Sequence, residues 1–405
     1  MSSVDFASAD SIRDPYPLLR QLQERDPVHW NAKLNAWCLT RYSDVEQAFR
    51  APYLSADRVR PIMDSRRHPT DDLLTLRSCL SLWMVFNDPP AHTRLRSLVS
   101  QAFTRRSTEA LRPVITRIAS ELLDNMSGQF DIISDFAYPL PAMVIAEMLG
   151  VPRQDVAKLK KWSDNLAAFV LVSRTNAQKH AVAAASLREM NEYFSHLVCI
   201  RRALSGDRII DDLIRAHDAN DALSLEELVA SCVLLLFAGH ETTTHFLANG
   251  VRALILNPEQ NVVFLKRFED ADFLRNALNE LLRWDGPSIS QPRIVSANAK
   301  LMGKNLVAGD RIYLLIAAAN RDPDVFEAPE KLDLYRPNAN KQIAFGSGIH
   351  VCLGAHLARL EGEIALPMLM SRFKRLRFAD GDLEWEDNFI IRGMKSLRLS
   401  EEDAA

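Results

Sequence analysis

The sequence has few cysteines and no pair of them in close spacing. Its five cysteines are Cys38, Cys79, Cys199, Cys232 and Cys352, and no CxxC pair occurs. An odd, widely spaced set makes a poor disulfide framework and is typical of a reducing compartment. The first residues also lack a basic segment followed by an apolar run, so we expect no secretory signal and a cytoplasmic protein.

Long apolar runs and an excess of one charge are also missing. No stretch of about 18 uninterrupted apolar residues occurs, so no membrane span is expected. The net charge of -3 over 405 residues provides no general electrostatic attraction for nucleic acid or an anionic membrane. What is present is 47% hydrophobic residues, enough for a large buried core.

Helical periodicity dominates the chain. Apolar residues at helical spacing predict one helix over 108–126 and another over 141–149. The longest pattern runs over 224–256, where Ser224 and Glu227 form a possible capping box at the start. Strand signals are fewer: 36–41 and 311–316 are rich in aromatic and β-branched residues, and 389–399 could form a hairpin. These patterns predict a mainly helical body with a small β region.

One segment places three glycines around a single cysteine, just before a helical pattern that begins near Gly354. It reads Phe345-Gly346-Ser347-Gly348-Ile349-His350-Val351-Cys352-Leu353-Gly354. Glycines let the backbone bend tightly and approach a flat ligand closely. A sulfur at a helix N-terminus gains from the helix dipole and from free N–H groups, which favour the thiolate. The segment therefore suits a cysteine that binds a planar cofactor.

Other interpretations of this segment stay open on the residues alone. A lone cysteine is most often a small buried hydrophobe. His350, Cys352 and His356 could form a zinc cluster, although no nearby residue supplies the fourth ligand that a tetrahedral site needs. Gly346 and Gly348 could begin a dinucleotide-binding loop, although Val351 occupies the third glycine position.

The same segment resembles the haem-binding signature of the cytochrome P450 family, F-x-x-G-x-x-x-C-x-G, at Phe345, Gly348, Cys352 and Gly354. The resemblance extends along essentially the whole chain and is strongest to soluble bacterial members, including hydroxylases of polyketides and macrolides. It implies a single haem-thiolate domain over 1–405, mainly α with a small β region and without a fused reductase. The implied cofactor is heme b (iron protoporphyrin IX), with Cys352 as the iron ligand. This thiolate donates electron density that favours O–O cleavage, an example established for the family.

A second motif lies in the middle of the long helical pattern, at Ala238-Gly239-His240-Glu241-Thr242-Thr243. A glycine in a helix interior costs about 1 kcal/mol relative to alanine, so its presence needs a reason. A solvated helix face is one explanation. The motif also resembles the family's oxygen-binding groove, A-G-x-[DE]-T. That resemblance implies that Ala238 contacts the haem, that Glu241 relays protons and that the Thr242 hydroxyl lies at the oxygen.

The family pattern also implies partners for the two haem propionates, which need cationic or hydrogen-bonding groups when partly buried. The implied partners are His92, Arg96, Arg293 and His350, and Phe345, Gly346 and Gly354 complete the implied cofactor contacts. Taken singly, each charge is more simply explained as part of the surface.

Glu280 and Arg283 match the family's E-x-x-R, and Arg336 matches the arginine that joins them, which implies a buried structural network.

The resemblance implies a monooxygenase that inserts one oxygen atom from dioxygen into a hydrophobic small molecule by hydroxylation or epoxidation, in secondary metabolism. The expected substrate walls are Trp83, Phe86, Leu234, Phe237, Ile289 and Ile391, and 169–186 is expected to form a lid.

The chain has no flavin or nicotinamide motif, so we expect electrons from a ferredoxin or flavodoxin with its reductase, docking near Arg94, Arg105 and Arg106. Two alternatives remain: a peroxygenase that uses hydrogen peroxide, and a non-enzymatic haem protein such as a gas sensor.

Overall fold

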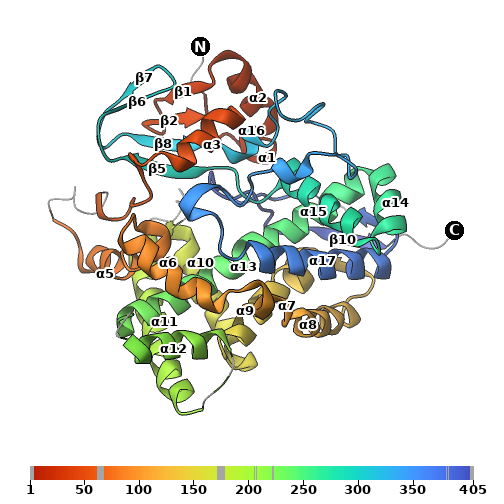
Figure 1. Cartoon of the computed structure of the whole chain (residues 1–405). Coiled ribbons are helices and arrows are strands. Elements are labelled where there is room, and N and C mark those ends of the chain that lie inside the picture. The colour runs from red at the N-terminus through yellow and green to blue at the C-terminus, as the bar shows by residue number, and fades with distance from the viewer. Residues whose placement is uncertain are drawn as a thin grey trace.

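A helical body carries a smaller β region at one end (Figure 1). The computed structural model describes residues 4–61, 68–170, 178–204, 206, 208–220, 223–379, 381 and 383–401. The α-helices are α1 (Ala9–Arg13), α2 (Tyr16–Arg25), α3 (Tyr42–Arg50), α5 (Asp71–Leu80), α6 (Ala91–Ala102), α7 (Arg105–Glu109), α8 (Arg112–Asp124), α9 (Pro139–Met148), α10 (Val156–Val170), α11 (Lys179–Arg202), α12 (Ile209–Asn220), α13 (Leu225–Leu256), α14 (Pro258–Arg267), α15 (Ala271–Asp285), α16 (Ile316–Ala319) and α17 (Ala355–Arg372). The short helices are η1 (Met84–Phe86), η2 (Ile133–Ala137, a π-helix), η3 (Arg153–Asp155), η4 (Ala339–Lys341) and η5 (Gly348–His350).

The β region contains a five-stranded sheet with the order β1-β2-β8-β5-β3. In this sheet β2 and β8 pair in parallel, with Ala36 opposite Arg311, and the other neighbours pair antiparallel. A three-stranded sheet has the order β4-β10-β9, and β6 and β7 form a two-stranded ribbon. The strands are β1 (Val28–Asn31), β2 (Ala36–Leu39), β3 (Leu54–Ser55), β4 (Gln129–Asp131), β5 (Gln291–Val295), β6 (Ala299–Leu301), β7 (Lys304–Leu306), β8 (Arg311–Leu314), β9 (Leu376–Phe378) and β10 (Arg398–Glu401).

Helix α13 is the axis of the helical body. Ser224 caps it, and the reciprocal bonds of a capping box with Glu227 are both present. Its 32 residues extend about 48 Å, and most of its side chains are buried. It packs against α9, α11, α15 and α17, so residues in its middle lie deep in the protein. The prediction of a long helix over 224–256 is confirmed.

The prediction of one helix over 108–126 is wrong in its first part. The structure ends α7 at Glu109 and begins α8 at Arg112. Pro113 is the reason, because proline cannot donate to the preceding turn but fits the first turn of a new helix. The expected helix over 141–149 and the expected strands over 36–41 and 311–316 are present as α9, β2 and β8.

The expected hairpin over 389–399 is also wrong. Only β10 forms near its end, and it pairs with β4 and β9, not with a neighbouring strand. Isolated bridges, Ser288 to Ile391 and Trp385 to Met394, hold the preceding segment. Tertiary pairing with distant strands has therefore overridden the local β pattern. Of the lid expected over 169–186, residues 171–177 lie outside the described residues, and the flanks belong to α10 and α11.

Candidate active site

Cys352 lies in the short connection between η5 and α17. Its N–H donates to the Phe345 carbonyl at 2.9 Å, which closes the loop that contains the glycines. Gly354 is the N-cap of α17, and a Cβ built on it would lie 4.0 Å from the Cys352 Sγ. The sulfur therefore faces the first turn of a helix, as the sequence predicts.

Gly346 and Gly348 have the backbone geometry that requires glycine. Both have a φ of 72°, in the left-handed region. A Cβ on Gly348 would lie 2.7 Å from the Phe49 carbonyl oxygen, so a side chain there would displace α3. The loop is thus held tightly against α3, which fixes the position of Cys352.

The environment of the Cys352 thiol is apolar but contains groups that favour the thiolate. The side chain is exposed and opens into the neighbouring space, although the surrounding protein displaces enough water to raise the pKa of the thiol. The Gly354 N–H, Arg96 and Arg359 act in the opposite direction. A cation bound at the sulfur would complete the deprotonation, because coordinating thiols lose their proton.

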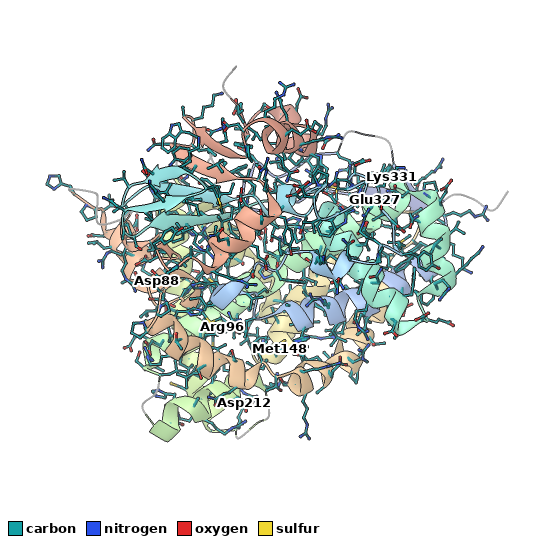
Figure 2. The ribbon with its side chains drawn as sticks, turned by 45° about the horizontal axis from the view of Figure 1, so that its top comes forward. Asp88, Arg96, Met148, Asp212, Glu327 and Lys331 are labelled. Atoms are coloured by element: carbon teal, nitrogen blue, oxygen red, sulfur yellow. The ribbon has the colours of Figure 1, made fainter. Side chains whose placement is uncertain are left out.

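Cys352 and the middle of α13 line the same cavity of ≈ 310 Å³, within the usual size of ligand pockets. Every cofactor-contact and catalytic residue expected from the sequence lines it: His92, Arg96, Ala238, Glu241, Thr242, Arg293, Phe345, Gly346, His350, Cys352 and Gly354. These residues come from α6, α13, β5 and the segment around η5, which are far apart in the chain. Figure 2 labels Arg96 on α6 and Asp88 just before that helix.

Polar groups on one side of this cavity lack protein partners. Both ring nitrogens of His92 and the Nε2 of His350 are buried without a hydrogen bond among the described residues. The two rings lie 4.1 Å apart. Arg96 uses one nitrogen on the Val351 carbonyl at 2.7 Å, and Arg293 donates to the Pro292 carbonyl at 2.9 Å. Burial, followed by the charges of His92, Arg293 and Arg96, lowers the pKa of His350 to about 3. Arg96 and Arg293 line this cavity as cations and favour an anion there.

Two histidines flank Glu241 on α13. The Glu241 carboxylate lies 3.6 Å from the Nε2 of His245 and 3.8 Å from the Nε2 of His240. Burial alone raises the pKa of Glu241, but His245, His240 and Lys160 more than offset it, so the pKa lies below its usual value. The Nδ1 of His240 contacts the Leu236 carbonyl at 2.7 Å and therefore carries a proton, since a carbonyl can only accept.

The apolar wall expected for the substrate is mostly present. Trp83, Phe86, Leu234, Phe237 and Ile391 line the cavity, whereas Ile289 does not and packs with Phe6 and Leu19 in a core cluster. The assignment of Ile289 is therefore wrong, and Ile390 lines the cavity instead. Sequence reasoning missed Arg58, which also lines the cavity, because nothing in its local sequence distinguishes it from a surface arginine.

Glu280, Arg283 and Arg336 form the buried network that the sequence predicts. Arg283 donates to Glu280 at 2.6 and 2.8 Å, and the Arg336 Nε donates to the same carboxylate at 3.0 Å. Arg283 also donates to the carbonyls of Asn320, Pro329 and Lys331. All three charges are buried and satisfied, which is the condition for tolerating an ion pair in a core.

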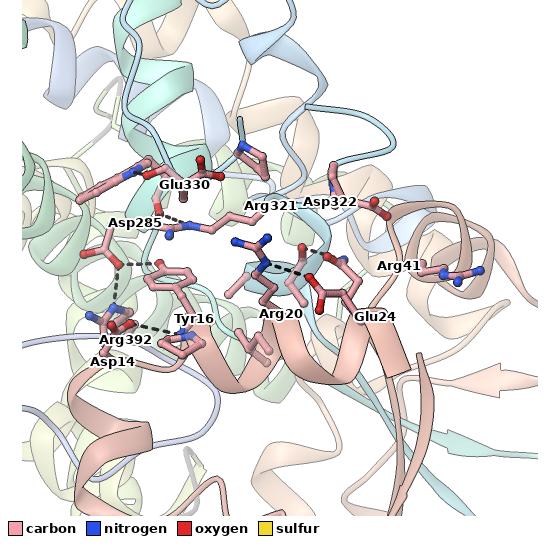
Figure 3. Close-up of a pocket in the computed structure, with 18 of the residues that line it drawn as sticks. Asp14, Tyr16, Arg20, Glu24, Arg41, Asp285, Arg321, Asp322, Glu330 and Arg392 are labelled. Atoms are coloured by element: carbon pink, nitrogen blue, oxygen red, sulfur yellow. Dashed lines mark hydrogen bonds and ion pairs between the residues drawn. The ribbon is translucent and has the colours of Figure 1, made fainter. Parts of the chain in front are cut away.

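A larger hollow, of ≈ 710 Å³, lies elsewhere, between α2, the end of α15 and the segment after α16 (Figure 3). Its central carboxylate, Asp285, accepts from the Tyr16 hydroxyl at 2.6 Å, from Arg392 at 2.6 Å and from Arg252 at 3.1 Å. These charged groups are bonded to one another, and the described residues that line the hollow include no cysteine, serine, threonine, lysine or histidine. Size alone therefore does not identify the active site, and the chemistry favours the cavity at Cys352.

The alternatives based on zinc and on a dinucleotide find no support in this geometry. Across the residues that the structure describes, no group of three or more His, Cys, Asp or Glu side chains is placed to hold a metal ion. The segment with Gly346 and Gly348 leads into a short 3-10 helix and does not join a strand to an α-helix. Within the described ranges, no helix has both the length and the apolar character needed to cross a bilayer.

Comparisons with known proteins agree with this geometry. Residues 68–388 match the Cytochrome P450 family. The chain is 36% identical to "Polyketide biosynthesis cytochrome P450 PksS" of Bacillus subtilis, over 96% of both chains, and 36% identical to "Vitamin D(3) 25-hydroxylase" of Pseudonocardia autotrophica, over 98% of this chain and 96% of that one. The structure of P450BioI with an acyl carrier protein superposes with a TM-score of 0.89 at 31% identity, over 97% of this chain and 100% of that one. The chain therefore belongs to the cytochrome P450 family and is a haem-dependent monooxygenase that takes electrons from a redox partner and inserts oxygen into a hydrophobic small molecule.

Proposed function

We propose that the cavity binds heme b, with Cys352 as the iron ligand and with His92, Arg96, Arg293 and His350 at the two propionates. The observation that carries this proposal is the pair of histidines whose buried nitrogens have no protein partner among the described residues. A buried polar group normally has a hydrogen-bond partner, so these nitrogens fit a ligand with acceptor oxygens. The glycine loop and Ala238 complete the contacts, since neither would obstruct a flat ring.

The haem supplies the iron at which dioxygen is reduced and split, and the chain supplies protons and exclusion of water. We assign the hydroxyl of Thr242 to the oxygen and the carboxyl of Glu241 to proton supply. The support is that both residues belong to α13 and line the cavity that Cys352 also lines. His245 and His240 keep Glu241 ionised at rest, so it must take up each proton before passing it on.

Substitutions on α13 test this assignment. Thr242→Ala should bind haem and substrate normally and still consume reducing equivalents, but with less product per equivalent and hydrogen peroxide in its place. Glu241→Gln should instead slow oxygen consumption by about a hundredfold, because an amide cannot relay a proton. Oxygen uptake, product and peroxide are measured together in the reconstituted system.

Controls for this test come from the neighbouring threonines. Thr243, which follows Thr242 directly, also lines the cavity and is therefore a competing assignment for the oxygen site. Thr244 is the better control, because its hydroxyl donates to the His240 carbonyl at 2.9 Å. Thr244→Ala should stay coupled. If Thr243→Ala uncouples the enzyme and Thr242→Ala does not, the oxygen site has been assigned to the wrong residue.

We propose a ferredoxin or flavodoxin, with its reductase, as the electron donor to this single-domain chain. Arg105 and Arg106 are exposed on α7, which packs against α17, the helix that follows Cys352. Arg94, of the same expected docking region, forms an ion pair with Glu227, with one contact at 3.0 Å, so Arg105 and Arg106 are the simpler positions to test. Reversing Arg105 and Arg106 to Glu should slow the first electron transfer about tenfold at low ionic strength and leave substrate binding unchanged. Equal rates in stopped-flow reduction would contradict this.

We also propose a cytoplasmic location and a role in secondary metabolism. The polyketide biosynthesis relative supports the role in secondary metabolism.

Peroxygenase activity is the competing enzymatic function. Glu241 argues against it, since hydrogen peroxide already carries both protons. Turnover with dioxygen and a reductase, compared with peroxide alone, separates the two, and a gas sensor would turn over with neither.

A further inference from the structure

Arg58 is a partly buried cation whose guanidinium bonds to no described residue. Within the part of the chain that the structure describes, no hydrogen bond or ion pair involves its guanidinium, whose central carbon lies 4.9 Å from the centre of the Phe86 ring. Burial, followed by the charge of Arg293, lowers the pKa of Arg58 to about 10, so it remains protonated at neutral pH. A cation that lines a cavity without a counter-charge favours an anion beside it, because a charge-assisted hydrogen bond is stronger there than in bulk water.

The cavity is lined by one arginine more than the two haem propionates need. A haem carries two propionates, and Arg96 and Arg293 are the two arginines assigned to them above. Glu241 is already flanked by His245 and His240. Arg58 is the third arginine that lines the cavity, and the neighbours that act on its charge are Arg293 and the phenol of Tyr313, not a carboxylate.

An aromatic path leads from Arg58 to the oxygen side of the cavity. Phe86, beneath the guanidinium, stacks on Trp83 with ring centres 5.9 Å apart and planes at 6°. Trp83 in turn lies 5.4 Å from Phe237. Phe237 belongs to α13, about one turn before Glu241 and Thr242. These rings form an apolar wall between a cation at one end and the proposed oxygen site at the other.

We propose that Arg58 binds the carboxylate of the substrate, and that the substrate class is hydrophobic monocarboxylic acids, whose hydrocarbon part lies along Phe86, Trp83 and Phe237. This proposal rests on the proposed haem site, since the excess of Arg58 depends on the two propionates. A guanidinium and a carboxylate match in shape and charge and can form two parallel hydrogen bonds. The apolar wall then sets the distance between the carboxylate and the oxidised carbon.

Matched ligands and variants test this on the haem-loaded enzyme without turnover. The probes are saturated carboxylic acids from octanoic to hexadecanoic acid and the methyl ester of each, and binding is measured by the shift of the haem spectrum and by calorimetry. Wild type should bind an acid more tightly than its ester. Arg58→Gln should weaken the acid about tenfold to a hundredfold and leave the ester unchanged. Arg58→Lys should recover part of the loss, because it keeps the charge but not the planar fork.

The control is Arg50→Gln, which removes an exposed arginine that pairs with Glu46 on α3 and should leave both affinities unchanged. Equal affinities for acid and ester in wild type would overturn the proposal, as would an equal loss of both in Arg58→Gln, or no binding by any acid of the series. Loss of haem from Arg58→Gln would also overturn it, by making Arg58 a propionate ligand. None of these results depends on oxygen chemistry, so the proposed roles of Glu241 and Thr242 are tested separately.

Discussion

The two hollows of this protein differ in how their polar groups are bonded. In the larger one, of ≈ 710 Å³, Asp285 is bonded to Tyr16, Arg252 and Arg392. In the smaller one, of ≈ 310 Å³, His92 and His350 have buried nitrogens that bond to no described residue. The first arrangement joins the N-terminal helices to the body of the protein. The second is arranged for a ligand, which shows that unsatisfied chemistry identifies a site better than volume does.

The largest loss of stability should come from removing the central charge of the larger hollow. Asp285→Asn leaves Arg252 and Arg392 buried without a counter-charge and should lower the free energy of unfolding by about 3–5 kcal/mol. Chemical denaturation of the haem-loaded protein measures this. The haem spectrum of the folded variant should be unchanged, because Asp285 does not line the other cavity.

The pH dependence of that variant provides its control. Burial raises the pKa of Asp285, but Arg392 and Arg252 more than offset this and hold the pKa below its usual value. A lowered pKa gives stability that is present above the unfolded-state value of about 3.9 and is lost as the pH falls through the folded-state pKa. The difference between wild type and Asp285→Asn should therefore shrink under acidic conditions. A difference that stays constant with pH would show that packing, not charge, is responsible.

A smaller effect is expected when the unpartnered groups of the other cavity are removed. In the double variant His92→Leu and His350→Leu, no bond between described protein groups is lost, so the melting temperature of the haem-free protein should not fall. Haem should leave the variant about tenfold faster or more, because charge-assisted bonds to the propionates are lost. Transfer of haem to apomyoglobin measures this rate. An unchanged rate with a lowered melting temperature would make these histidines structural.

Much of the fold was predictable because local signals and burial agree in it. The capping box of Ser224 and the apolar pattern after it define α13, and its interior motif lies where the cavity is. The errors in predicting helices and strands arose where a proline or a contact with a distant segment determines the structure. Pro113 divides a continuous apolar pattern, and β10 pairs with strands far away in the sequence.

The residues proposed to hold the cofactor were predictable from one compact motif, and those proposed to contact the substrate were not. Cys352, His350 and the glycines lie within ten residues of one another, and their spacing carries the chemistry. Arg58 reaches the cavity through contacts between segments distant in the sequence: its guanidinium lies over the Phe86 ring, and the neighbouring Ala56 N–H donates to Asp88 at 3.0 Å. Ile289 lies outside the cavity and Ile390 lines it because of how their distant segments meet, with the Ile289 N–H donating to the Ile390 carbonyl at 2.9 Å.

The most direct test of the central claim is the spectrum of the reduced, carbon monoxide-treated enzyme with and without Cys352. The wild type should show the strongly red-shifted Soret band of a thiolate ligand. Cys352→His should lose that band and still bind some haem, because His92, Arg96, Arg293 and His350 remain in the cavity. Survival of the red-shifted band in Cys352→His would contradict the account, since the thiolate at the iron would then have to come from another residue.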